Sequence, residues 1–129
     1  MAFGNLKFDT LTTSDTKNTS TEKSIDTSYV YNGVAKVWGV LTDAAALTNS
    51  FNITTGTDHG TGDYSYTLTA AFGDVNHATT AVTSGAGAGR MCTSNTARKA
   101  TNTIAVEIET HSGSAEDLAQ ELSTHGDLA

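Results

Sequence analysis

The sequence contains no proline, a single cysteine and only seven lysines and arginines among its 129 residues. The one cysteine, Cys92, has no partner for a disulfide within the chain. No apolar run approaches the roughly 18 residues that a membrane-spanning helix needs, and the first residues lack the basic and apolar regions of a secretory signal peptide. We therefore expect a protein that is kept in a cytosol-like compartment, or that leaves it by a route such as cell lysis.

Basic residues are scarce, and the formal net charge is −7. Nucleic acid attracts basic surfaces through its phosphates, and anionic lipid does so as well. The acidic balance therefore predicts neither a nucleic-acid nor a membrane partner. The simplest interpretation is a solvated acidic surface that favours solubility.

Small residues, many of them β-branched, fill the sequence instead. Threonine makes up about a fifth of the chain, and hydrophobic residues only 37%. This composition favours strands over helical bundles. Alternation of apolar and polar residues predicts strands within 34–41, 47–55, 64–70, 77–84 and 102–109. We predict an all-β fold, an antiparallel β-sandwich or jelly-roll-like domain, over residues 29–129.

Two of the expected strands carry more specific predictions. In 34–41 both phases of the alternation are largely apolar, so we expect this strand to be covered on both faces. In 47–55, Leu47, Phe51 and Ile53 share one side of a half-buried strand.

The stretch "TDHGTGDYSYTL", residues 57–68, combines turn residues with an alternating run. Its first half holds Asp58, Gly60, Gly62 and Asp63. A phosphate-binding loop needs a lysine and a following helix, and this stretch has neither. A calcium site of the EF-hand type needs a characteristic spacing of its acidic ligands, which is also missing. We predict a β-hairpin turn in which the two glycines supply positive φ angles.

Large side chains on the expected strands are predicted to lie in the core or in a subunit interface. They are Trp38, Phe51, Ile53, Tyr64, Tyr66, Leu68, Ile104, Val106 and Ile108. The other interpretation is an aromatic platform for a sugar, built from Trp38 with Tyr29, Tyr31, Tyr64 and Tyr66. Core or interface is the more frequent place for such residues in strands, and it is our prediction.

The two ends of the sequence differ from the middle. Residues 1–28 combine an apolar stretch, with Phe3, Leu6, Phe8 and Leu11, and a polar tract that cannot add much to a core. We predict an extended N-terminal arm that docks on another protein through these four residues. In the last segment, "SGSAEDLAQELSTHGDLA", local propensity predicts a short helix from Ala115 to Leu122, begun by a capping box of Ser114 and Asp117.

No arrangement of residues indicates enzyme chemistry. The histidines at 59, 77, 111 and 125 are widely spaced, and a lone histidine in a turn is usually solvated. Cys92 lacks a catalytic signature and is expected to be a buried thiol. Glu107 and Glu109 share a strand face that is normally the wet side of a sheet. We predict that the protein is not an enzyme and holds no cofactor or metal.

Several segments together resemble a known family. "NGVAKVWGVL", "SFNITTGTDHGTGDYSYTLT", "FGDVNHATTAVT" and the terminal "HGDLA" are similar to a β-rich domain of head-fibre and tail-fibre proteins of tailed bacteriophages, marine and cyanobacterial ones especially. The opening "FGNLKFDTLTTSD" resembles the attachment segment that precedes this domain. The likeness covers nearly the whole chain. It also implies a final strand before Gly-Asp-Leu-Ala in place of the helix, although "LAQELSTHGDLA" and His125 depart from the family pattern.

The resemblance implies a virion structural protein, often trimeric, without catalytic residues. Because no shaft, heptad repeat or added adhesin domain is visible in the sequence, we expect a capsid decoration protein, either a cement or a short head-fibre protein. It would be synthesised in the host cytoplasm and lie on the virion surface. Its partners would be two copies of itself and the major capsid protein or other virion proteins. The alternative is a small tail-fibre or tail-tip adhesin that binds a host glycan or receptor through Trp38, Tyr64 or Tyr66; a small hydrolase is a third class.

Overall fold

The computed structural model describes residues 10–13, 23–26, 31, 33–84 and 89–128. The chain divides into two compact units, Met1–Val34 and Ala35–Ala129. In the first unit, strand β1 (Thr10–Thr13) pairs antiparallel with β2 (Lys23–Asp26), in a segment where the sequence shows no strand periodicity. Of the predicted docking residues, Leu11 lies in β1 and the three others, Phe3, Leu6 and Phe8, lie outside the described residues. Docking by this unit stays a prediction.

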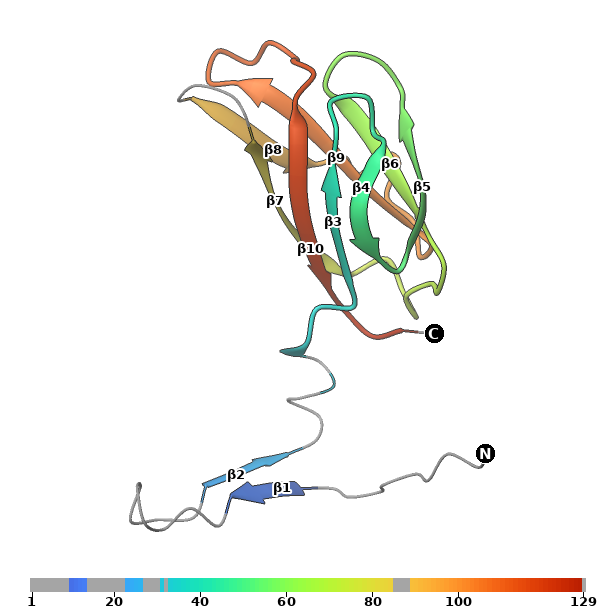
Figure 1. The fold of residues 1–129 in the computed structure, drawn as a ribbon, viewed down its shortest axis with the longest axis vertical. Coiled ribbons are helices and arrows are strands. Elements are labelled where there is room, and N and C mark those ends of the chain that lie inside the picture. Colours follow the sequence, from blue (N-terminus) through green and yellow to red (C-terminus); the bar gives the residue numbers. More distant parts are fainter. Residues whose placement is uncertain (1–9, 14–22, 27–30, 32, 85–88, 129) are drawn as a thin grey trace. The chain divides into compact units, whose positions relative to one another are not determined.

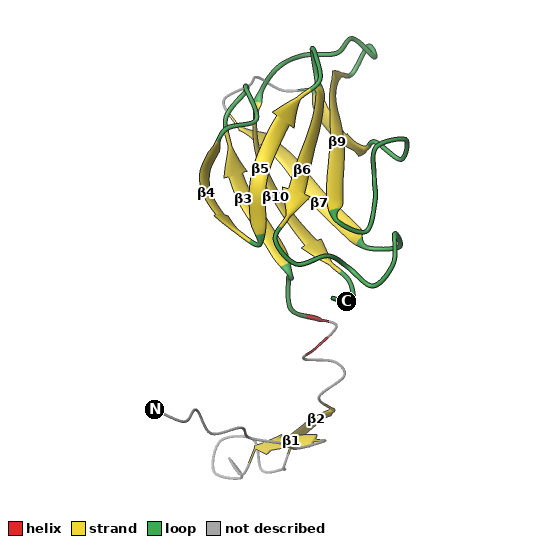
Figure 2. Cartoon of the chain, turned by 90° about the vertical axis from the view of Figure 1, so that its right-hand side faces the viewer, coloured by secondary structure: helices red, strands yellow, loops and turns green. Residues whose placement is uncertain are grey.

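The second unit is an antiparallel β-sandwich, which confirms the predicted fold class (Figures 1 and 2). Its strands are β3 (Val37–Leu41), β4 (Leu47–Phe51), β5 (Ile53–Asp58), β6 (Asp63–Leu68), β7 (Ala78–Ser84), β8 (Arg90–Ser94), β9 (Thr103–Thr110) and β10 (Ala119–His125). One sheet, which we call the front sheet, has the order β4-β3-β10-β7. The other, the back sheet, has the order β5-β6-β9-β8.

The hydrophobic core lies between the two sheets. Strand alternation directs every second side chain inward, and Tyr64, Tyr66 and Ile104 of the back sheet are fully buried, as is Val37 of the front sheet. The structure places seven of the nine predicted core or interface residues inside: Ile53, Tyr64, Tyr66, Leu68, Ile104, Val106 and Ile108. The other two, Trp38 and Phe51, have 38% and 54% of their surface exposed and belong to no core.

The predicted single strand 47–55 is wrong, because the chain changes sheet at Asn52. Asn52 adopts φ 61°, and the residues on either side belong to β4 and β5. The kink reverses the phase of the alternation, so Phe51 points to solvent while Ile53 remains in the core. The Asn52 side chain stabilises the corner: its Nδ2 donates to the carbonyls of Lys36 (3.2 Å) and Ala70 (3.0 Å), and its Oδ1 accepts the Ala70 N–H (2.7 Å).

Local propensity predicts a helix over 115–122, whereas the resemblance implies a final strand, and the strand is present: residues 119–125 form β10. This strand lies between β3 and β7 and pairs with both. Its inward polar side chains have partners: the Tyr66 hydroxyl donates to Gln120 Oε1 (2.7 Å), and the Thr79 and Thr124 hydroxyls lie 2.9 Å apart. Backbone pairing on two sides and these buried hydrogen bonds outweigh the local helix propensity of the segment.

Candidate functional site

The loop between β5 and β6 is a hairpin turn. Gly60 and Gly62 adopt φ angles of 126° and 73°, as positive-φ turn residues. The Asp58 carboxylate accepts the Gly60 N–H (2.8 Å), and the Asp63 N–H donates to the Gly60 carbonyl (2.9 Å). Asp58 therefore has a structural role within its own turn.

The turn is fastened to the rest of the sandwich through Gly62 and Asp117. The Gly62 carbonyl accepts the Ile108 N–H at 2.8 Å, and the Gly62 N–H donates to Asp117 Oδ1 at 2.7 Å. The Tyr64 hydroxyl lies 2.9 Å from the same Asp117 oxygen. Burial, and then the hydrogen bond to Asp117, raise the pKa of the Tyr64 phenol. Asp117, predicted as a helix-capping partner, therefore anchors the hairpin.

The acid at the other side of the turn, Asp63, belongs to a structural network on the outer side of the back sheet. Arg98 Nε lies 3.1 and 2.9 Å from the two Asp63 carboxylate oxygens. The buried Asn95 amide donates to both Asp63 (3.0 Å) and Glu107 (2.9 Å), which are direct cross-strand partners. Because like charges directly opposite in a sheet repel, Asn95 and Arg98 offset the pairing of two carboxylates. Glu107 is thereby part of a satisfied network.

The histidines are not gathered into a site. Within the described ranges, no group of three or more His, Cys, Asp and Glu side chains is placed to hold a metal ion. His59 Nε2 lies 2.8 Å from the Ser65 hydroxyl, and His111 is exposed. His77, expected to be a solvated turn residue, is instead 2% exposed, and burial lowers its pKa.

Cys92 is partly buried on β8. Burial raises the pKa of its thiol above the ordinary value. At neutral pH the side chain is therefore a thiol, the weakly nucleophilic form.

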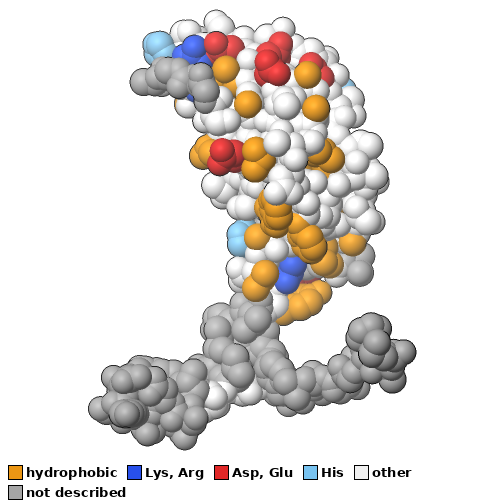
Figure 3. Space-filling view, viewed as in Figure 1, with side chains coloured by type: hydrophobic (Ala, Val, Ile, Leu, Met, Phe, Trp, Pro, Cys, Tyr) orange, Lys and Arg blue, Asp and Glu red, His pale blue; other side chains and the backbone are white. Residues whose placement is uncertain are grey.

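The outward side of the front sheet carries an apolar surface, which we call the front face and define by Trp38, Val40, Phe51 and Val82. All four are exposed by 37–54%. Trp38 of β3 stands directly opposite Phe51 of β4 in the register. Figure 3 shows hydrophobic side chains gathered on this side of the sandwich.

Charge is nearly absent from the front face. The alternation that directs Trp38 and Val40 outward also directs Ser123 and Glu121 of β10 outward, and then Thr80 and Val82 of β7. At the outward positions of these four strands Glu121 is the one acid, and His125 at the end of β10 is the one basic residue. The expectation that β3 is covered on both faces fails within this chain, since its outward side is open to solvent.

The outward side of the back sheet is different in kind. Its positions hold Asp63, Glu107 and Glu109, the hydroxyls of several threonines, and one exposed apolar residue, Met91. A soluble domain can leave such a face in water at no cost, whereas contiguous exposed apolar residues usually mark an interaction site. The two faces of one sandwich thus differ in what they can bind.

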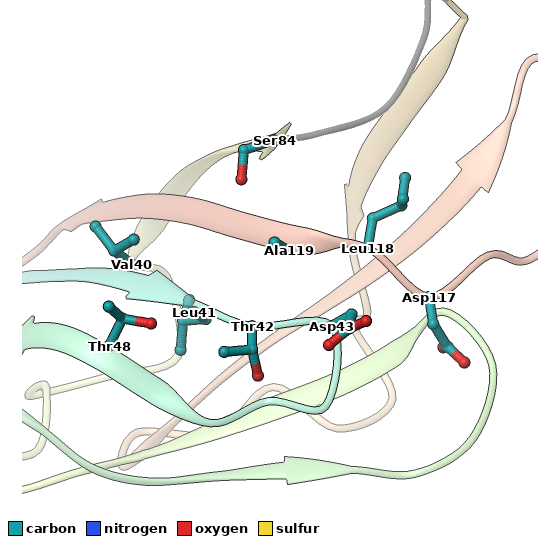
Figure 4. Close-up of a pocket in the computed structure, with 9 residues that line it drawn as sticks. All are labelled: Val40, Leu41, Thr42, Asp43, Thr48, Ser84, Asp117, Leu118 and Ala119. Atoms are coloured by element: carbon teal, nitrogen blue, oxygen red, sulfur yellow. The ribbon is translucent and has the colours of Figure 1, made fainter.

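Two open depressions border the front face. The larger, about 410 Å³, is lined among others by Val40, Thr48, Asp43, Asp117 and Ala119. In Figure 4, Val40 and Thr48 lie at one end of it and Asp117 at the other. The smaller, about 260 Å³, lies between β7 and β10 over Val82 and Glu121. Neither is lined by an aromatic residue, so neither offers a ring on which a sugar could stack.

The aromatic platform, the alternative to a core or interface position, loses two of its five residues to the core. Tyr64 and Tyr66 are fully buried and cannot touch a ligand, Tyr29 lies outside the described residues, and Trp38 remains at the surface. Sequence reasoning did not single out Val40 or Val82. Val40 could have been found, because it lies two residues after Trp38 and therefore on the same side of the strand. Val82 has no such signal, since it is a single large residue in a run of small ones.

Comparisons of the chain with protein-family models, with curated proteins and with solved structures give no match. No helix among the described residues is long and apolar enough to cross a membrane.

Proposed function

We propose that this chain is a structural protein of a tailed-bacteriophage virion, a capsid decoration protein that self-associates as a trimer through its front face and is anchored by its N-terminal arm, residues 1–28. One observation carries the proposal: the sandwich has a charged, hydroxyl-rich back face and an apolar front face with a single acid, Glu121.

A second copy of the chain is the occupant that we assign to the front face. Fully burying a large apolar side chain contributes about 1.5–3 kcal/mol, and four such residues are partly exposed here. A domain of this size has a modest core of its own, so association adds stability that the monomer lacks. Glu121, which lies directly between Val40 and Val82 in the register, would then be the one acid within the contact.

The mass of the purified full-length chain in solution tests self-association. We expect a trimer of about three times the 13.4 kDa chain mass by light scattering or sedimentation. Val82→Glu and Phe51→Glu place a charge on the front face and should each yield monomer with an unchanged circular dichroism spectrum. Thr67→Glu, at an exposed position of the back sheet, is the matched control and should remain trimeric. A wild-type chain that is monomeric at every concentration contradicts self-association.

The position of the chain on the virion is tested by labelling intact particles and by deleting the N-terminal arm. Gold-labelled antibody raised against the chain should decorate the heads of intact particles of the phage that encodes it. Removing residues 1–28 should abolish incorporation into particles while leaving the sandwich folded. Labelling confined to the tail contradicts the decoration role.

The second candidate is an adhesin that binds a glycan. It is favoured by one observation, the partly exposed Trp38 ring beside the exposed Phe51 ring. Two results together would select this candidate over the first. The wild-type chain would bind on a glycan array and lose this binding in Trp38→Ala, and it would be monomeric in solution.

A further inference from the structure

His77 occupies a closed position at one end of the sandwich, in the connection between β6 and β7. Its ring stacks on Phe72, with centroids 4.5 Å apart and planes inclined by 21°. The C-terminal segment closes over it, since a Cβ added to Gly126 would come within 2.9 Å of His77 Cβ. Phe72 in turn bridges to Leu128, and the Gly73 N–H donates to the Asp127 carbonyl at 2.7 Å.

A third segment, the turn before β9, meets the same ring. His77 Nε2 lies 3.1 Å from the Ala100 carbonyl, and the Phe72 N–H donates to the Thr101 carbonyl at 2.8 Å. The Lys99 ammonium donates to the His77 carbonyl at 2.5 Å. Three chain segments, 72–77, 99–101 and 126–128, therefore converge on one imidazole.

The hydrogen bonds fix the protonation state of the ring. A carbonyl oxygen only accepts, so Nε2 carries the proton and Nδ1 is left as an acceptor. Nδ1 is buried and has no hydrogen-bond partner among the described residues. A second proton would thus arrive at a buried nitrogen that has nothing to donate to.

The charged groups around the ring do not favour a cation overall. Lys99, on the turn before β9, opposes a positive imidazole, and Asp74, on the same connection as His77, favours one. Asp127, on the C-terminal segment, is exposed to solvent and holds this site through its backbone carbonyl.

We propose that His77 is an acid-sensitive latch: protonation of the ring releases the contacts among 72–77, 99–101 and 126–128 while the two sheets remain formed. The latch is independent of the proposed function, because none of its residues lies on the front face.

The direction of the effect follows from proton linkage. Burial lowers the pKa of His77 from its ordinary value of 6.5, so the closed form binds fewer protons than the open form. The closed state is therefore fully favoured above about pH 6.5 and is lost as the pH falls through the lowered pKa.

A heteronuclear NMR titration of the full-length chain from pH 7.5 to 4.5 tests the latch. In the wild type we expect the His77 ring to be the Nε2–H tautomer and to titrate with a midpoint below 6.5. The amides of Gly73 and Gly126 should change with the same midpoint, whereas the Tyr66 amide in the core should not. A ring that titrates at 6.5 or above, or amides that do not follow it, overturns the proposal.

Two variants sharpen the result. His77→Gln keeps a donor for the Ala100 carbonyl and cannot be protonated, so the Gly73 and Gly126 transition should vanish. His111→Gln, at an exposed site, should leave the transition unchanged. Persistence of the transition in a folded His77→Gln chain overturns the latch; if that variant does not fold, the wild-type titration decides alone.

Discussion

At the scale of single residues, Gly62 and Gly113 share a backbone conformation but not an environment. Their φ angles are 73° and 80°. A Cβ at Gly62 would lie 2.5 Å from the Ile108 carbonyl oxygen, whereas a Cβ at Gly113 would meet nothing within 4 Å. Gly113 is therefore needed for its φ angle alone. Gly62 is needed both for its φ angle and because the backbone approaches β9 closely at this position.

This difference predicts unequal costs of substitution. Gly113→Ala should lower the free energy of unfolding by about 1–2 kcal/mol, the cost of a left-handed alanine. Gly62→Ala carries the same cost and also separates the hairpin from β9, so we expect a total of at least about 3 kcal/mol. Urea denaturation of the two variants measures the difference. Equal destabilisation would mean that the Gly62 contact with β9 contributes nothing.

At the scale of elements, the corner at Asn52 joins the two sheets through one side chain. Its amide mimics a strand neighbour by both donating to and accepting from the backbone of Ala70, and it also donates to the Lys36 carbonyl. The positive φ of 61° is one that asparagine tolerates better than most residues. The element depends on the amide group rather than on side-chain size.

Substitutions at Asn52 separate these roles. Asn52→Gly tolerates the φ angle and loses three hydrogen bonds, so it should destabilise by about 1–3 kcal/mol. Asn52→Asp keeps the shape but faces two carbonyl oxygens with a carboxylate, and we expect it to be the more destabilised of the two at pH 7. Thermal unfolding compares them; an aspartate variant as stable as wild type would show that the amide donor is unimportant. Lowering the pH toward 4 should recover part of the loss in the aspartate variant only, because a protonated carboxyl can donate.

The sequence predicted those elements whose alternation involves large residues. Tyr64, Tyr66 and Leu68 mark β6, and Ile104, Val106 and Ile108 mark β9, and both strands lie where they were expected. Arg90–Ser94, the strand β8, has a single large apolar residue, Met91, and was not predicted. Propensity over 115–122 is local, whereas β10 is determined by neighbours far along the chain: Ser84, which pairs with Ala119, and Trp38, which pairs with Ser123.

Only part of the candidate site could be predicted from the sequence, because the rest depends on contacts between distant segments. Trp38 and Phe51 were singled out as large side chains, but the alternation of β3 leaves Trp38 on its outward side. The exposure of Phe51 depends on the register shift in β4 and on the phase change at Asn52, which apolar periodicity does not report. His77 was misread because its burial comes from the distant segments 99–101 and 126–128. Contacts far apart in the sequence leave no local signal.

At the scale of the whole molecule, the front face holds little of the acidic charge. The chain carries a net charge of −7, yet the outward positions of the front sheet hold one acid. Repulsion between copies therefore acts over the remaining surface and weakens with added salt, whereas apolar association at the front face does not. Self-association, if it follows this geometry, should strengthen as the ionic strength rises.

The sandwich also keeps two phenols inside, which makes its stability sensitive to alkaline pH. Burial raises the pKa of Tyr64 and of Tyr66 above the ordinary value of 10.0. A raised folded-state pKa means that stability is fully present below about pH 10 and is lost as the pH rises further, because only the unfolded chain releases these protons. Each such group lowers the free energy of unfolding by about 1.4 kcal/mol per pH unit in that range.

We therefore predict that the tyrosinate absorbance of these two residues appears together with unfolding rather than near pH 10. Absorbance at 295 nm and far-ultraviolet circular dichroism, followed from pH 9 to 13, should show one shared transition in which two phenols ionise. Tyr66→Phe should reduce that step to one phenol and, because Gln120 Oε1 loses its donor, lower the stability at pH 7. Ionisation of both phenols while the strand signal persists would show that water reaches the core between the sheets.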